Sequence, residues 1–178
     1  GGKLKALKDG LSGKDTDFGV PMLKLSTLER ADVVLTTYES LRDYQVSFAS
    51  VSFGVGVFDE IQKAKNPRSL ISRSVAAVNA DFSIGLSGTP VENSLSDLWT
   101  ILDLLAPGLI KLSLHDFMEH YSGSTEDPNV LENLRSLQRD LVLPQNSNPP
   151  PVLRRMKHEV FTNGDLPEKR VNAAIDTS

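Results

Sequence analysis

The sequence predicts an α/β fold with parallel strands, and two observations lead to this class. Short apolar runs rich in β-branched residues alternate with segments of helical periodicity. Each apolar run ends in small polar or acidic residues. A succession of strand, helix and strand favours a parallel sheet with right-handed crossovers. The chain has 178 residues, which is enough for one compact domain with a core.

Three apolar runs, at residues 33–35, 55–58 and 82–86, are the predicted strands. None alternates strictly between apolar and polar residues, and such runs are typical of strands buried on both faces. The residues that follow the three runs are Thr36-Thr37-Tyr38, Asp59-Glu60 and Ser87-Gly88-Thr89-Pro90, respectively.

Helices are predicted between and after the later strands. Pro67 suits the first position of a helix that extends to residue 78. Ser94 and Asp97 resemble a capping box at the start of another helix. Trp99 lies in the apolar stripe of that second helix, and we expect it to be a core residue rather than a platform for stacking bases.

The pattern divides the chain into three regions. Residues 1–30 are a poorly specified lead-in, and residues 31–110 hold the predicted strands with their helices. Residues 111–178 are mostly helical, with helices expected at 113–121 and 131–141, a proline-rich loop and a return segment.

Composition excludes several kinds of site. The chain has no cysteine, so disulfides and thiolate metal sites are excluded, and its three histidines show no clustering with carboxylates in the sequence. No apolar run approaches the roughly 20 residues that span a bilayer, so we expect a cytoplasmic protein without a membrane partner. The net charge is −4 and the isoelectric point is near 5.4, so any contact with nucleic acid must come from local patches.

The residues at the strand ends indicate where chemistry could occur. Ligands bind outside the carboxyl ends of parallel strands, so we expect Thr37, Asp59 and Ser87 to line one edge of a sheet. An Asp-Glu pair after a buried strand is what phosphoryl-transfer ATPases require. The first carboxylate holds Mg²⁺, usually through water, and the second polarises the attacking water. Two acids that are merely solvated at a strand end are the alternative for this pair taken alone.

Five segments in succession resemble the Swi/Snf-type helicase-like ATPases of superfamily two. They are DVVLTTYESL, VFDEIQKAKNP, LSGTPVENSLSDLW, VLRRMKHEV and LPEKR, and the resemblance covers residues 31–170. It implies the later strands of a RecA-like first lobe, followed by helices that protrude from it. It also implies that the parent protein uses ATP to move along double-stranded DNA.

The resemblance assigns roles to residues near the nucleotide. Asp59 and Glu60 correspond to the acidic box that holds Mg²⁺ and activates water. Gln62 stands where the family more often has histidine, at a position that links the nucleotide site to the next motif. Ser87, Gly88 and Thr89 correspond to the motif that couples nucleotide state to DNA movement, although Thr89-Pro90 is also ordinary turn chemistry.

The resemblance also implies a DNA-facing side. Thr36, Thr37 and Tyr38 fall in a motif that touches the DNA backbone, and Lys65 with Asn66 lies in a loop that faces DNA in relatives. Thr36 and Thr37 could instead satisfy amides at a strand end. The lysines near Arg68 could instead form a solvated basic face.

Two parts that the family needs are not found in the sequence. A phosphate-binding loop requires a glycine-rich turn followed by Lys and Ser or Thr, whereas Gly13-Lys14 is followed by Asp15. The second RecA-like lobe is also missing. We therefore expect a piece of a longer protein that binds Mg²⁺ and ATP only when intact. This chain alone should hold neither and should not hydrolyse ATP.

Two alternatives remain open. The chain could be a non-catalytic α/β interaction module descended from such an ATPase, which the missing phosphate loop favours and the retained Asp59-Glu60 disfavours. A carboxylate metal hydrolase would need more acids at the strand ends than the sequence offers. A DNA motor would lie on the nucleoid in a bacterium or in the nucleus of a eukaryote. Remodelling, transcription restart, repair and defence all remain open as its biological role.

Overall fold

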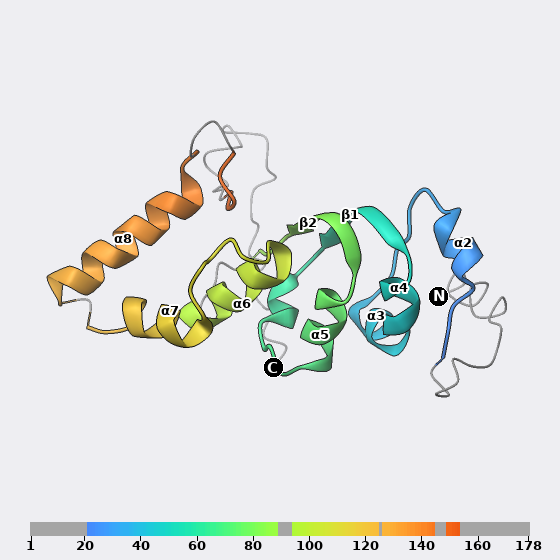
Figure 1. Cartoon of the computed structure of the whole chain (residues 1–178), viewed down its shortest axis with the longest axis horizontal. Coiled ribbons are helices and arrows are strands. Elements are labelled where there is room, and N and C mark those ends of the chain that lie inside the picture. Colours follow the sequence, from blue (N-terminus) through green and yellow to red (C-terminus); the bar gives the residue numbers. More distant parts are fainter. Residues whose placement is uncertain (1–20, 89–93, 125, 145–148, 154–178) are drawn as a thin grey trace, which may run out of the picture. The chain divides into compact units, whose positions relative to one another are not determined.

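The computed structural model describes residues 21–88, 94–124, 126–144 and 149–153 (Figure 1). The chain divides into two compact units, Gly1–Ser122 and Gly123–Ser178. Helices and strands are mixed as the sequence predicts, so the α/β class is confirmed. The elements of the first unit are α2 (Leu25–Glu29), α3 (Tyr38–Asp43), α4 (Gln45–Ala49), β1 (Ser52–Phe58), the 3-10 helix η1 (Ile61–Ala64), α5 (Leu70–Ala76), β2 (Asn79–Gly85), α6 (Leu95–Leu105) and α7 (Leu114–Tyr121).

The sheet of the first unit consists of β1 and β2, which pair in parallel. The register runs from Ser52 opposite Asn79 to Phe58 opposite Gly85. Beyond the strands, the Leu86 amide donates to the Phe58 carbonyl at 2.8 Å, and the Ile61 amide donates to the Leu86 carbonyl at 2.9 Å. The carboxyl ends of the two strands therefore meet at one edge, as predicted.

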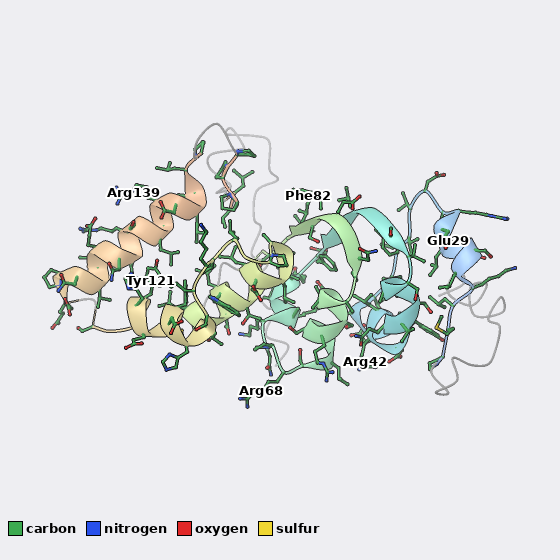
Figure 2. All side chains as sticks on the ribbon, in the orientation of Figure 1. Glu29, Arg42, Arg68, Phe82, Tyr121 and Arg139 are labelled. Carbon is green, nitrogen blue, oxygen red and sulfur yellow. The ribbon has the colours of Figure 1, made fainter. Side chains whose placement is uncertain are left out.

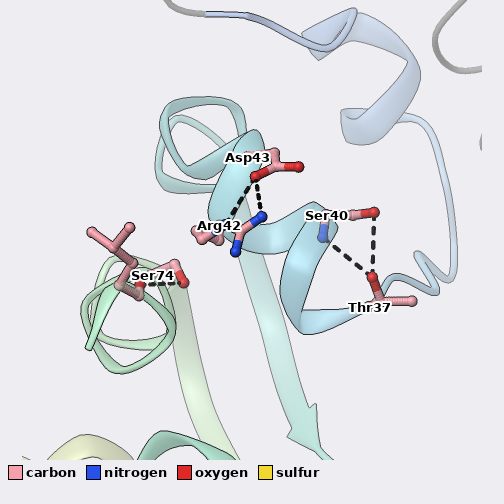
Figure 3. Close-up of polar contacts among 6 residues, drawn as sticks. Thr37, Ser40, Arg42, Asp43 and Ser74 are labelled. Carbon is pink, nitrogen blue, oxygen red and sulfur yellow. Dashed lines mark hydrogen bonds and ion pairs between the residues drawn. The ribbon is translucent and has the colours of Figure 1, made fainter. Parts of the chain in front are cut away.

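The predicted strand at residues 33–35 is wrong. This segment belongs to no helix or strand, and Thr37 ends it by capping α3, with its hydroxyl accepting from the Ser40 amide at 3.2 Å (Figure 3). Val33 and Leu35 are 84% and 91% exposed. Since β-propensity reflects fit to a partly buried surface, an apolar run without such a surface need not pair as a strand.

Two predicted helix features differ from the structure. The helix predicted from Pro67 begins later, at Leu70, because the Ser69 hydroxyl caps α5 by accepting from the Ser72 amide at 3.1 Å. Trp99 is half-buried rather than fully enclosed, and its indole N–H donates to the Leu112 carbonyl at 3.0 Å. An indole needs a partner for this donor, which holds the ring near the surface.

Other helix predictions are confirmed. Ser94 caps α6 by accepting from the Asp97 amide at 3.2 Å. The segment predicted at 113–121 is α7 with its Ser113 cap, and the segment predicted at 131–141 lies within α8 (Pro128–Val142) of the second unit. Among the described residues, no helix combines the length and apolarity needed to cross a membrane.

One face of the sheet is packed. Phe58 is buried in the core, and Gly85 lies against α6 and η1. A Cβ added at Gly85 would lie 2.5 Å from Leu105 Cδ1 and 3.1 Å from Ile61 Cγ2. Glycine at this position therefore allows α6 to approach the strand closely.

The other face of the sheet is open. Val55, Val57, Phe82 and Ile84 are 57%, 59%, 63% and 37% exposed, and the first two lie opposite the second two in the register. Figure 2 shows Phe82 on the side of the sheet away from α5. The expectation of strands buried on both faces is met on one face only within the described residues.

The second unit is built on α8. Asp127 caps this helix by accepting from the Asn129 amide at 2.9 Å, and Pro128 occupies its first turn. Leu137 and Leu141 are its buried residues. The Val152 amide donates to the Leu141 carbonyl at 3.0 Å, so the chain after the proline-rich segment returns to the end of α8.

Candidate functional site

Asp59 and Glu60 form a tight turn directly after β1, which we call the acid turn. Both side chains are exposed at the edge where β1 and β2 end. Asp59 Oδ1 accepts from the Glu60 amide at 3.0 Å, and the Glu60 carbonyl accepts from the Lys63 amide at 3.0 Å. These bonds fix the turn between the last residue of β1 and η1.

Glu60 has a left-handed backbone, with φ 53° and ψ 47°. It is the one non-glycine residue with positive φ among the described parts of the chain. For an L-residue with a Cβ, this conformation costs roughly 1–2 kcal/mol. Such strain persists only where the surrounding structure holds it, and it is enriched at functional sites.

Gln62 contacts the acid turn directly. Its amide Nε2 donates a hydrogen bond to Glu60 Oε2. Gln62 Oε1 is buried and has no hydrogen-bond partner within the described structure. Gln62 therefore contacts Glu60 through a neutral side chain, and its role as a link to the next motif stays a prediction.

Ser87 and Gly88 follow β2 at the same edge as the acid turn, because Leu86 bonds to both Phe58 and Ile61. Both residues are exposed, and a Cβ added at Gly88 would meet open space. Thr89, the third residue of the predicted coupling motif, lies outside the described residues.

Tyr38 brings the predicted DNA-facing segment to the acid turn. Its hydroxyl donates to the Asp59 carbonyl oxygen at 2.9 Å. Burial of the phenol, followed by the nearby charges of Asp59 and Glu60, raises the pKa of Tyr38 to about 12. The Lys63 ammonium lies 5.9 Å from the centroid of the same ring.

A cavity of about 420 Å³ lies between the segment before α3 and β1. Its lining is largely apolar but includes Thr36, Thr37, Asp59 and Glu60. Gln62, Ser87 and Gly88 do not line this cavity. The Thr36 hydroxyl is buried and has no hydrogen-bond partner in the described structure.

Lys65 and Asn66 follow η1 and are engaged within the chain. The Lys65 ammonium lies 3.1 Å from Asp97 Oδ2 at the start of α6. Asn66 Oδ1 accepts from the Arg68 amide at 3.0 Å, which shapes the turn before α5. Sequence reasoning placed Asp97 only in a helix cap. No local signal reveals its ion pair, since the two residues lie far apart in the chain.

The donor set of the acid turn fits Mg²⁺. This ion prefers carboxylate oxygens and retains several waters. Asp59 Oδ1 is engaged by the Glu60 amide, whereas Oδ2 has no partner among the described residues and the side chain is exposed. Asp59 therefore offers one unengaged carboxylate oxygen of the kind that a hydrated Mg²⁺ prefers, and its role as the Mg²⁺ ligand stays a prediction.

A group of exposed side chains on α7 contradicts one expectation from the sequence. The ligand atoms of His115, Asp116 and Glu119 lie within 4.8 Å of one another, so one histidine does cluster with carboxylates. Asp116 already accepts a hydrogen bond from the Ser113 hydroxyl at 2.8 Å, which lowers the pKa of Asp116. We assign this exposed group no function.

Comparisons with known proteins identify relatives of this chain. A family model described as the SNF2-related domain matches residues 10–175. Zorya protein ZorD of Escherichia coli O139:H28 is 43% identical over 150 residues, which cover 83% of this chain and 13% of that protein. A putative ATP-dependent helicase/translocase of Bacillus subtilis, YwqA, is 34% identical over 141 residues, covering 79% of this chain and 14% of that protein. This chain thus spans only a small part of these curated relatives.

A solved structure is similar as well. The Sulfolobus solfataricus SWI2/SNF2 ATPase core in complex with dsDNA matches with a TM-score of 0.53 and 32% sequence identity. The match covers 62% of this chain and 23% of that one.

Proposed function

The chain belongs to the SNF2-related domain family, and from this membership we propose that it is part of an ATP-driven motor that moves along double-stranded DNA. The observation that carries the proposal is the parallel pairing of β1 with β2. This pairing brings the acid turn and Ser87-Gly88 to one edge of the sheet. An active site of an ATP-driven motor needs an acidic pair at such an edge, and beside it a segment that can move when the nucleotide changes.

In this proposal the acid turn performs the chemistry. Asp59 would hold Mg²⁺, usually through water, and the bound ion would supply neutralisation of phosphate charge on ATP. Glu60 accepts a hydrogen bond from the attacking water and orients it. Its contact with Gln62 limits the positions that the carboxylate can take, which favours orientation of the water.

The coupling residues are Gln62, Ser87, Gly88 and Thr89. Gln62 contacts Glu60 directly. Ser87 and Gly88 follow Leu86, whose backbone is hydrogen-bonded to Phe58 and Ile61, the residues on either side of the acid turn. A change in nucleotide state at the acid turn could therefore reach the end of β2 over short distances. The exposed Gly88 leaves room for such a shift.

The DNA-facing residues are Thr36, Thr37, Tyr38, Lys65 and Asn66, and they would contact backbone phosphates rather than bases. The double-stranded DNA in the similar Sulfolobus solfataricus structure supports this partner. In this chain, Lys65 would have to exchange Asp97 for a phosphate. Such an exchange makes binding sensitive to salt.

Other parts of a longer protein would supply the phosphate-binding loop and the second RecA-like lobe. The small share of the relatives that this chain covers supports this division. Residues 31–110 would then belong to the first lobe and residues 111–178 to a protrusion with a return segment. This chain alone should bind Mg-ATP weakly and turn none over, and the complete motor should reside where the DNA is.

The experiment is phosphate release by the longer protein with and without double-stranded DNA. Glu60→Gln keeps the shape of the side chain but removes its charge, so hydrolysis should fall by about two orders of magnitude or more while Mg-ATP still binds. Asp59→Asn should also weaken the part of ATP binding that depends on Mg²⁺. Undiminished turnover in Glu60→Gln would remove Glu60 from the catalytic role.

The same assay tests the interaction-module alternative. A module without nucleotide chemistry predicts no DNA-stimulated hydrolysis in the unmutated protein. In that case the acid turn would have only a structural role.

A further inference from the structure

The peptide bond between Asp59 and Glu60 is held at both of its polar ends. Its carbonyl oxygen accepts from the Tyr38 hydroxyl at 2.9 Å, and its N–H donates to Asp59 Oδ1 at 3.0 Å. The second bond is local to the acid turn, whereas the first comes from a residue 21 positions earlier in the chain. The orientation of this peptide therefore depends on where α3 begins.

The structure fixes the Tyr38 ring as well as its hydroxyl. The ring packs against the hydrophobic core, and the Lys63 ammonium of η1 lies 5.9 Å from its centroid. Tyr38 is also the first residue of α3, directly after the Thr37 cap. A displacement of the Thr36–Tyr38 segment would therefore move a hydroxyl that has little freedom to compensate.

We propose that Tyr38 is a positioning residue of the acid turn, which transmits movement of the Thr36–Tyr38 segment to the Glu60 carboxylate through the Asp59 carbonyl. The proposal rests on the proposed function, in which that segment meets DNA and Glu60 orients water. Tyr38 itself touches no reacting atom. It acts through the backbone that directs the Glu60 side chain.

The left-handed backbone of Glu60 explains why one hydrogen bond can matter. With φ at 53°, Glu60 is in a conformation that a residue with a Cβ avoids unless it is held there. Release of the Asp59 carbonyl lets the adjoining peptide rotate toward negative φ at Glu60. This rotation would swing the carboxylate away from Gln62 and from the water that it orients.

The matched variants for a test are Tyr38→Phe and Tyr121→Phe. Both keep the ring and remove one phenolic oxygen. Tyr121 lies on α7, where its ring packs against Phe117 at 4.7 Å between centroids. In the longer protein, Tyr38→Phe should lower DNA-stimulated kcat by about tenfold and leave KM for ATP within about twofold, since a lost orienting bond acts on the transition state. Tyr121→Phe should behave as the unmutated protein.

Amide hydrogen exchange in the 178-residue chain gives a readout that does not depend on activity. Exchange of the Glu60 amide should become several-fold faster in Tyr38→Phe, because its bond to Asp59 Oδ1 loses the fixed geometry. It should stay unchanged in Tyr121→Phe. Faster exchange together with lower kcat supports the proposal.

Full turnover in Tyr38→Phe would overturn the proposal. Lower turnover with unchanged Glu60 exchange would also overturn it, because the hydroxyl would then act elsewhere, for instance on DNA. If the unmutated protein lacks DNA-stimulated hydrolysis, the proposed function fails. Glu60 exchange then still decides whether Tyr38 positions the acid turn.

Discussion

The two faces of the β1–β2 sheet differ in what covers them. On one face, Phe58 is buried in the core and Gly85 lies under Leu105 and Ile61. On the other face, Val55 and Phe82 are mostly exposed. An apolar run in the sequence therefore indicates only that a strand face is suited to burial. Whether that face is buried depends on which elements pack against it. The candidate site lies at the edge where these two faces end.

The largest expected difference between the faces comes from phenylalanine truncation. Phe58→Ala should lower the free energy of unfolding by about 3–5 kcal/mol, because it opens a cavity in the core. Phe82→Ala should change it by less than about 1 kcal/mol, because the ring is 63% exposed. Urea unfolding of both variants makes this measurement. Equal losses would show that the open face is covered in solution.

Glycine substitution sharpens the same contrast with a smaller effect. Gly85→Ala should destabilise the fold by about 1–3 kcal/mol, since its Cβ would displace Leu105 while Ile61 closes the other side. Gly54→Ala in β1 is the control, because no atom lies within 4 Å of its added Cβ. We expect Gly54→Ala to be neutral within about 0.5 kcal/mol. A neutral Gly85→Ala would mean that α6 packs less closely on β2 than the structure has it.

The ion pair between Lys65 and Asp97 tests how firmly η1 and α6 are joined beside the packed face. Its coupling energy should be about 0.2–1 kcal/mol and should decrease with added salt, because both side chains are partly exposed. A double-mutant cycle with Lys65→Met and Asp97→Asn isolates this pairwise energy from the effect of Asp97 at the helix start. A coupling of several kcal/mol would instead indicate a desolvated pair.

The smallest expected effect lies at the exposed start of α3. The backbone amide of Glu39, then the Thr37 hydroxyl, hold the pKa of the Glu39 carboxyl below its usual value. A lowered pKa in the folded state stabilises the fold above the unfolded-state pKa. This contribution is lost as the pH falls through the folded-state pKa. Thr37→Ala should raise the pKa of Glu39, whereas Thr37→Ser, which keeps the hydroxyl, should not. An NMR titration of the Glu39 carboxyl measures both, and an unchanged pKa in Thr37→Ala would exclude this contact.

The sequence was sufficient to predict the parts of the site that depend on neighbours along the chain. Thr37, Asp59 and Ser87 were expected at one sheet edge, because parallel strands align their carboxyl ends. The β1–β2 pairing confirms this for Asp59 and Ser87, whereas the expectation is wrong for Thr37, which follows no strand. The cap of α6 at Ser94 was equally local. The roles of the site residues in hydrolysis and DNA contact stay predictions.

Features that depend on distant residues were not predictable from the sequence. The run at 33–35 consists of residue types that favour strands, but no strand of the described structure pairs with it. Neither the hydrogen bond from Tyr38 to Asp59 nor the pair of Lys65 with Asp97 leaves a sequence pattern. A glutamate also gives no sign that its backbone will be left-handed, because that conformation is imposed by the turn.

The left-handed Glu60 has a consequence for how this protein can evolve. Glycine or asparagine tolerates that backbone better than glutamate does, so replacing Glu60 should make the fold more stable at the expense of any role of its carboxylate. Mutation under selection for stability alone would therefore tend to remove this glutamate. In a lineage that no longer hydrolyses ATP, we expect Glu60 to be substituted before Asp59, and most often by glycine.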